Sequence, residues 1–311
     1  MGTPAFSVPV LAALTDAGHR VVGVYTRPDR PTGRGRAMSA PEVKRYAQDN
    51  GLPVFQPASL RRDAATTDEL CSLSADVLVV AAYGLFLPKA AFAGPALGAL
   101  NVHPSLLPKY RGPSPVASAI LSGEDATGVT IMQVDEGMDS GPIVAQRESA
   151  IGHDETAEEL TLRLFQEGGS LLVEVLPRWA RGEIEAQAQD EGATTTTSRL
   201  QREDGRIDWS DPAAEIALQV RAFHPWPGSH TSWRGRSLKI VAANGWEGSE
   251  HPPAAPGEVV SVVDGGVGAG TGLGLLQLRR VQLEGRRAVD VVEFVQGHRD
   301  FVGSRLGAQI P

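Results

Sequence analysis

"ADVLVVAAYG" (residues 75–84) is a short stretch that is apolar at most positions. A strand with one face in water alternates apolar and polar residues, whereas a strand buried on both faces is apolar almost throughout, as in parallel sheets. The stretch therefore predicts a strand inside a parallel sheet that is covered by other elements on both faces.

The same kind of run recurs on both sides of this stretch, and helical patterns lie between the runs. The expected strands are 19–26, 75–84, 98–103 and 128–135. The expected helices are 8–19, 41–51 and 114–124. Strands that alternate with helices form βαβ units. The fold class that follows for this part is α/β, with a doubly wound, Rossmann-like and mostly parallel sheet.

The clearest helix is expected at 156–181. Thr156 and Glu159 have the spacing of a capping box, and apolar residues follow at helical intervals. Residues 182–200 are then polar, threonine-rich and poor in apolar anchors, which is typical of a linker. We therefore expect a first domain at 1–181.

Residues 201–311 have a different pattern. One helix is expected at 210–228, and strand-like segments bounded by glycines follow it before a short closing helix at 290–297. Short strands of this kind predict a small β-barrel as the second domain.

The chain opens on a turn that leads into the helix at 8–19, with no strand before it. The first strand of a doubly wound sheet is usually central. Removing a central strand should cost more than the marginal stability of a domain. We therefore expect the native start to lie several residues upstream of Met1.

Composition limits the class of protein. A hydrophobic content of 41% and a charged content of 21% are typical of a soluble globular protein. No apolar run approaches the roughly 18 residues needed to span a membrane, and no signal segment opens the chain. The single cysteine, Cys71, excludes a disulfide framework and a cysteine-based zinc site. It also favours a reducing cytoplasm.

Charge is informative at one place. The net charge of −8 argues against a general nucleic-acid-binding protein. The run "RPDRPTGRGR" (27–36) nevertheless contains four arginines and one aspartate. Its glycines and prolines favour an exposed, adaptable loop. That loop is either a solvated basic segment or a contact for phosphate groups.

Polar side chains gather where two expected strands end. Asn101 and His103 are two positions apart, so their side chains share one face of the strand. The next strand runs into a loop with Asp135, Glu136 and Asp139, and one of these carboxylates could orient His103. Ligands bind at the carboxyl ends of strands in such sheets. A buried structural pair and a solvated acidic loop remain alternative interpretations. A histidine metal site fits poorly, because no two histidines are four positions apart.

Several segments resemble the folate-dependent formyltransferase family, and within it the methionyl-tRNA formyltransferases. They are "GTPAFSVPVL" (2–11), "RPDRPTGRGR" (27–36), "AYGLFLP" (82–88), "NVHPSLLPKYRG" (101–112), "GVTIMQVDEGMDSG" (128–141) and "AFHPWPGS" (222–229). The resemblance is in register along essentially the whole chain.

The resemblance implies transfer of a formyl group from 10-formyltetrahydrofolate to the amino group of methionyl initiator tRNA. The catalytic residues implied are Asn101, His103 and Asp139, and no metal is implied. The folate-contacting residues implied are Ser105, Leu106, Leu107 and Pro108. The tRNA contacts implied are Arg34 and Arg36, together with an OB-like barrel at 201–311. We expect a cytoplasmic monomer that acts on tRNA and folate without a membrane.

Two other activities share the expected catalytic trio. One is formyl transfer to a small amine, either glycinamide ribonucleotide or an amino sugar nucleotide. The other is hydrolysis of 10-formyltetrahydrofolate, in which water replaces the amine. The arginine run at 27–36 and the second domain favour tRNA as the acceptor, since a small acceptor needs neither.

Overall fold

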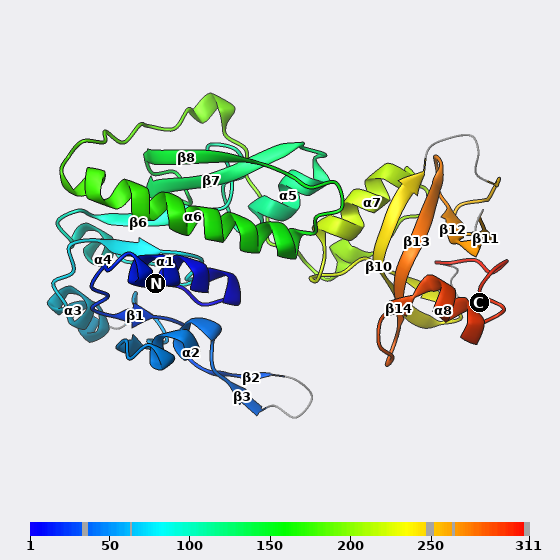
Figure 1. Cartoon of the computed structure of the whole chain (residues 1–311), viewed down its shortest axis with the longest axis horizontal. Coiled ribbons are helices and arrows are strands. Elements are labelled where there is room, and N and C mark those ends of the chain that lie inside the picture. Colours follow the sequence, from blue (N-terminus) through cyan, green and yellow to red (C-terminus); the bar gives the residue numbers. More distant parts are fainter. Residues whose placement is uncertain (33–36, 63, 247–251, 263–264, 308–311) are drawn as a thin grey trace. The chain divides into compact units, whose positions relative to one another are not determined.

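The structure is a computed structural model that describes residues 1–32, 37–62, 64–246, 252–262 and 265–307. Its contacts divide the chain into two compact units (Figure 1). The first unit is Met1–Pro115, Ala126–Ala150 and Thr161–Thr197, and the second is Val116–Asp125, Ile151–Leu160 and Ser198–Pro311.

The first unit contains a two-stranded parallel sheet and a four-stranded mixed sheet. β1 (Val24–Tyr25) pairs in parallel with β4 (Val54–Phe55). A separate four-stranded sheet has the order β5-β6-β7-β8. Its strands are β5 (Leu78–Val80), β6 (Ala99–His103), β7 (Ala126–Gln133) and β8 (Ile143–Ala150). β5 and β6 are parallel, but β7 is antiparallel to both of its neighbours. The α/β class is confirmed, whereas the expected predominance of parallel strands was wrong at the β7–β8 edge.

Met1 and Gly2 lie between β1 and β5 and join the two sheets. The Gly2 amide donates to Tyr25 O at 3.0 Å, and the Ala81 amide donates to Met1 O at 2.8 Å. The Met1 amino group donates to Val79 O at 2.6 Å, and its burial lowers its pKa to about 5. A cavity of about 280 Å³ extends from Met1 between the two strands.

Helices flank these strands. They are α1 (Val8–Asp16), α2 (Glu42–Asp49), α3 (Ala64–Ser72), α4 (Lys89–Ala93) and α6 (Ala157–Ala180). A short 3-10 turn, η1 (Ala5–Ser7), precedes α1, and β2 (Arg30–Thr32) pairs with β3 (Ala37–Ser39). α6 begins with the expected capping box, because the Thr156 amide donates to Glu159 Oε2 at 3.0 Å. Its buried face shares a hydrophobic core with Val102, Val129 and Ile131 of the sheet.

The second unit is an antiparallel sheet with helices. The strand order is β11-β12-β13-β10-β9, and β14 pairs with β13. The strands are β9 (His230–Trp233), β10 (Arg236–Trp246), β11 (Val259–Ser261), β12 (Val267–Gly270), β13 (Leu275–Leu283) and β14 (Val289–Asp290). The helices are α5 (Pro115–Leu121), α7 (Ala213–Ala222) and α8 (Val291–Gly297). A register shift between Ile240 and Ala243 interrupts the β10–β13 ladder, and bulges of this kind bend a sheet.

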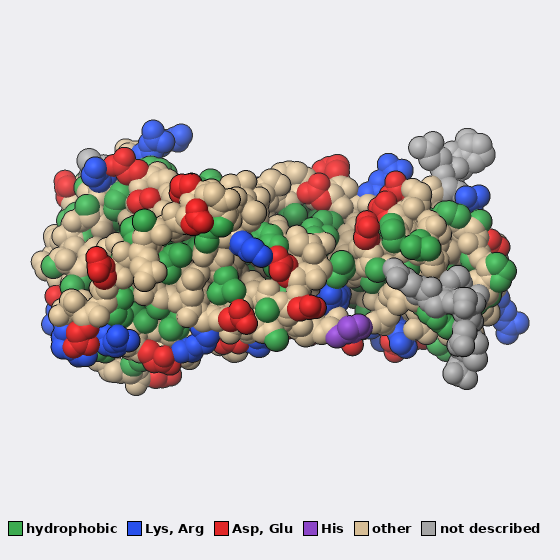
Figure 2. Space-filling model, turned by 90° about the horizontal axis from the view of Figure 1, so that it is seen from above, with side chains coloured by type: hydrophobic (Ala, Val, Ile, Leu, Met, Phe, Trp, Pro, Cys, Tyr) green, Lys and Arg blue, Asp and Glu red, His purple; other side chains and the backbone are tan. Residues whose placement is uncertain are grey.

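The surface carries both signs of charge. On the face drawn in Figure 2, Lys and Arg side chains are interspersed with Asp and Glu. Among the described residues, no helix is long and apolar enough to cross a membrane.

Replacing Gly168 by alanine tests how closely α6 approaches the sheet. A Cβ at this position would lie 2.5 Å from Val102 Cγ1 and 2.9 Å from Val129 Cγ2, and valine side chains have little freedom to move aside. Alanine favours a helix over glycine by about 1 kcal/mol, but overpacking costs about 1–3 kcal/mol. We therefore expect urea unfolding to show a net loss of stability. Ser170→Ala, at an exposed position of the same helix, serves as the control, and a gain for Gly168→Ala would contradict the close packing.

Candidate active site

Asn101 and His103 lie on β6 with their side chains on one face of the sheet. Val102, between them, points the other way into the hydrophobic core. The His103 side chain is almost fully buried, with a relative exposure of 6%. The strand therefore presents an amide and an imidazole side by side, as the sequence predicted.

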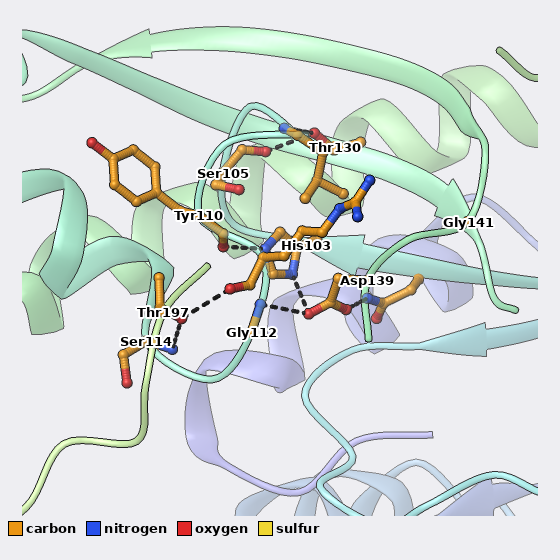
Figure 3. Close-up of polar contacts among 12 residues, drawn as sticks. His103, Ser105, Tyr110, Gly112, Ser114, Thr130, Asp139, Gly141 and Thr197 are labelled. Atoms are coloured by element: carbon orange, nitrogen blue, oxygen red, sulfur yellow. Dashed lines mark hydrogen bonds and ion pairs between the residues drawn. The ribbon is translucent and has the colours of Figure 1, made fainter. Parts of the chain in front are cut away.

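Asp139 completes the group from the loop between β7 and β8. Its Oδ2 lies 3.7 Å from His103 Nδ1, and its Oδ1 accepts a hydrogen bond from Asn101 Nδ2 at 3.4 Å. Its Oδ2 also accepts from the Gly112 amide at 3.0 Å (Figure 3). The three expected catalytic residues are thus brought together.

The route by which Asp139 arrives differs from the expected one. Asn101 pairs with Met132 in an antiparallel ladder, so β7 ends beside the start of β6 rather than beside its carboxyl end. The loop after β7 has to turn back to reach His103. Asp139 adopts a left-handed conformation there, with φ of 52°.

The second nitrogen of His103 is also engaged. Nε2 lies 3.1 Å from the carbonyl oxygen of Tyr110 (Figure 3). A carbonyl oxygen can only accept a hydrogen bond, so Nε2 is the nitrogen that carries a proton. In the doubly protonated ring, Nδ1–H is the donor left to face Asp139 and the space beside it.

The four residues implied as folate contacts are not equivalent. Ser105 is fully buried, and its hydroxyl donates to Lys109 O at 2.7 Å. Leu107 is buried too, and its amide donates to Thr130 Oγ1 at 3.1 Å. Leu106 and Pro108 keep partial exposure. Only the latter two therefore have side-chain surface to offer, while Ser105 and Leu107 hold the loop in shape. The expected tRNA contacts, Arg34 and Arg36, lie outside the described residues.

Two residues that contact Asp139 were not among those predicted from the sequence. Gly112 donates to the carboxylate, and its position in the quoted "KYRG" motif was the available signal. Gln189 donates to the Asp139 carbonyl at 2.8 Å. It lies in the polar segment interpreted as a linker, where no pattern distinguishes it.

No group of three His, Cys, Asp or Glu residues that could hold a metal ion occurs among the residues that the structure describes. Asn101 and His103 can donate hydrogen bonds at the site, and the Asp139 carboxylate can accept a proton.

Two family models match this chain. One described as "Formyl transferase" matches residues 1–176, and one described as "Formyl transferase, C-terminal domain" matches residues 199–299. The chain belongs to the formyl transferase family.

Curated relatives match nearly the full length of this formyl transferase. A protein from Chloroflexus aurantiacus named methionyl-tRNA formyltransferase is 48% identical over 313 residues, covering 99% of this chain and 98% of the relative. A protein of the same name from Coxiella burnetii is 42% identical, covering 96% and 94%.

Solved structures share the fold of this formyl transferase. An N-formyltransferase from Helicobacter canadensis, in complex with folinic acid and dTDP-3-aminofucose, has a TM-score of 0.64 at 18% identity and covers 89% of this chain and 97% of its own. HypX from Aquifex aeolicus, in complex with tetrahydrofolic acid, has a TM-score of 0.59 at 20% identity over 82% of this chain. The chain spans 44% of the HypX chain. At these identities the likeness concerns the fold alone.

The conformation of Asp139 can be tested by comparing Asp139→Gly with Asp139→Ala. Both remove the carboxylate, but alanine is disfavoured in the left-handed region by about 1–2 kcal/mol, whereas glycine is not. We expect Asp139→Gly to unfold at a urea concentration at least as high as Asp139→Ala.

Glu136, in the same loop, provides the matched control because its φ is not positive. There the order should reverse, since glycine normally loses about 0.5–1 kcal/mol relative to alanine. A lower urea midpoint for Asp139→Gly than for Asp139→Ala, as expected at position 136, would show that Asp139 is not held in a left-handed conformation in solution.

Proposed function

We propose that this formyl transferase moves the formyl group of 10-formyltetrahydrofolate to the amino group of methionine on initiator tRNA. The observation that carries the proposal is the 48% identity, over 99% of this chain, to a protein named methionyl-tRNA formyltransferase. The cluster of Asn101, His103 and Asp139 supplies groups suited to this reaction.

Asn101 and His103 would stabilise the oxygen that gains negative charge when the amine attacks the formyl carbon. The amide nitrogen of Asn101 carries two hydrogens. One faces Asp139 Oδ1 at 3.4 Å, and the other would be donated to the oxygen. Protonated His103 donates from Nδ1, since Nε2 faces the Tyr110 carbonyl. Such preorganised donors are worth about 10²–10³ in rate each.

Asp139 would carry the proton. As the new C–N bond forms, the attacking nitrogen becomes positively charged and must lose a proton. The Asp139 carboxylate accepts it, directly or through water, and returns it to the folate nitrogen as the old C–N bond breaks. No proton is gained or lost in total, and no covalent enzyme intermediate is needed.

The folate would supply the activated formyl group, and the "SLLP" loop would hold it. Leu106 and Pro108 retain exposed apolar surface on the loop that follows His103, which suits one face of a flat heteroaromatic ring. Ser105 and Leu107 would act through the backbone geometry of the loop, because their side chains are buried.

The tRNA would contact two parts of the chain. Arg34 and Arg36, which follow β2 in the sequence, would contact phosphates. The domain at 201–311, which we assign as an OB-like barrel joined to the catalytic domain (1–181) through 182–200, would bind along the tRNA. The tRNA substrate also implies a cytoplasmic protein, which we expect to act as a monomer.

Purified protein with 10-formyltetrahydrofolate and three separate acceptors tests the proposal. The acceptors are methionyl initiator tRNA, glycinamide ribonucleotide and an amino sugar nucleotide. We expect transfer to the tRNA, with kcat lowered about 10²–10⁴-fold in Asp139→Asn and about 10²–10³-fold in Asn101→Ala. Transfer to a small acceptor alone would overturn the tRNA assignment. Release of formate at a rate that none of the acceptors changes would identify a hydrolase.

Salt dependence tests the arginine loop. Replacing Arg34 and Arg36 together by alanine should raise KM for the tRNA. It should also reduce the slope of log affinity against log salt by about 1–2, because two phosphate contacts are lost. Arg178→Ala, at an exposed position of α6, is the control for a general loss of positive charge. An unchanged slope in the double variant would show that the loop does not contact phosphates.

A further inference from the structure

Residues 187–197, here called the strap, bind both loops that build the site. Gln187 pairs with Ile143, at the end of the loop that carries Asp139. Farther along, the Arg111 amide donates to Thr195 O at 2.9 Å, and the Thr197 amide donates to Arg111 O at 2.7 Å. The strap is therefore a structural part of the first unit.

Both the nitrogen and the oxygen of the Gln189 side-chain amide form hydrogen bonds. Its Nε2 donates to Asp139 O at 2.8 Å and to Gly141 O at 2.7 Å. Its Oε1 accepts from Arg111 Nε at 2.8 Å. Both carbonyl oxygens can only accept and the guanidinium can only donate, so the amide has one permitted orientation. The side chain is also buried.

Arg111 fixes Gln189 in turn. Its guanidinium is buried and binds both carboxylate oxygens of Glu191, at 3.2 and 2.9 Å. The hydrogen bonds from Arg111 lower the pKa of the Glu191 carboxyl group, so the pair is charged at neutral pH. Arg111 is also flanked by the two residues whose backbone groups contact the site: Tyr110, facing His103, and Gly112, facing Asp139.

Asp139 needs such support. It is a non-glycine residue with φ of 52°, a conformation that persists only where the surroundings enforce it. The preceding loop residues 136–138 are exposed and provide little packing. The Gln189 amide holds the carbonyl of Asp139 itself and that of Gly141, so it fixes the backbone on both sides of Ser140.

We propose that Gln189 is a positioning residue for Asp139, and that Arg111 and Glu191 hold it in place. The inference rests on the proposed function in one respect, namely that Asp139 takes part in the reaction. Without Gln189, the loop relaxes from the left-handed conformation and the carboxylate leaves its place beside Asn101 and His103.

The main test is Gln189→Met, with Gln187→Met as the matched control. Gln187 is exposed and pairs with Ile143 through its backbone, so the same substitution there leaves the strap intact. We expect kcat to fall about 10–100-fold in Gln189→Met, as misplacement of a catalytic group does. KM for the acceptor should change less than about twofold, since the residue does not meet the substrate.

Gln189→Glu separates the hydrogen bond with Arg111 from the two hydrogen bonds to the carbonyl oxygens. It also provides a second variant in case Gln189→Met does not fold. An ionised glutamate still accepts from Arg111 but cannot donate to the two carbonyl oxygens. We expect it to keep the contact with Arg111 and to fold, as circular dichroism would show, and yet to show the same loss of kcat. Normal turnover in Gln189→Glu would overturn the inference.

A double-variant cycle shows whether the effect passes through Asp139. In an Asp139→Asn background, measured by single turnover, Gln189→Met should have little further effect. An equal loss in both backgrounds would mean a general structural role and would overturn the inference.

Hydrogen exchange provides a readout that does not require activity. In Gln189→Met, exchange over residues 134–142 should be about tenfold faster than in Gln187→Met, because a local opening loses two hydrogen bonds. Equal exchange in the two variants would overturn the inference. A wild-type protein that transfers no formyl group, but whose loop responds in this way, would instead count against the proposed function alone.

Discussion

Asp139 belongs to a loop whose preceding strand runs away from the residues that it contacts. Because β7 is antiparallel to β6, the chain has to reverse within residues 134–142 before the carboxylate can meet Asn101 and His103. That reversal places Asp139 in a left-handed conformation. The Gly112 amide holds its carboxylate, and the Gln189 amide holds its backbone. The remaining geometry of the site depends on this arrangement.

Asn101 and His103 could be paired from the sequence because strand periodicity is a local property. The direction of β7 could not be found in this way. Its six central residues are all buried, which is the pattern of a parallel strand. An antiparallel strand that is covered on both faces has the same pattern, so apolar content does not distinguish the two.

Contacts between residues that are far apart in the sequence were even harder to predict. Gln189 meets Asp139 fifty positions away, and its polar neighbours Gln187 and Asp190 are exposed. The close approach of Leu106 to β7 is similar, because it depends on Gly128. A Cβ at Gly128 would lie 2.5 Å from Leu106 Cδ2. A glycine inside a strand allows another residue to approach closely, but it does not indicate which residue does so.

The strap also bears on how the two domains could be separated or recombined. The first family model ends at residue 176 and the second begins at residue 199, so neither includes the strap. The first compact unit extends to Thr197. A chimera joined at 181 would take the strap from the donor of the second domain, and Arg111 would then face a foreign residue at position 189. A junction after Thr197 would keep the amide, the guanidinium and the carboxylate of one parent together.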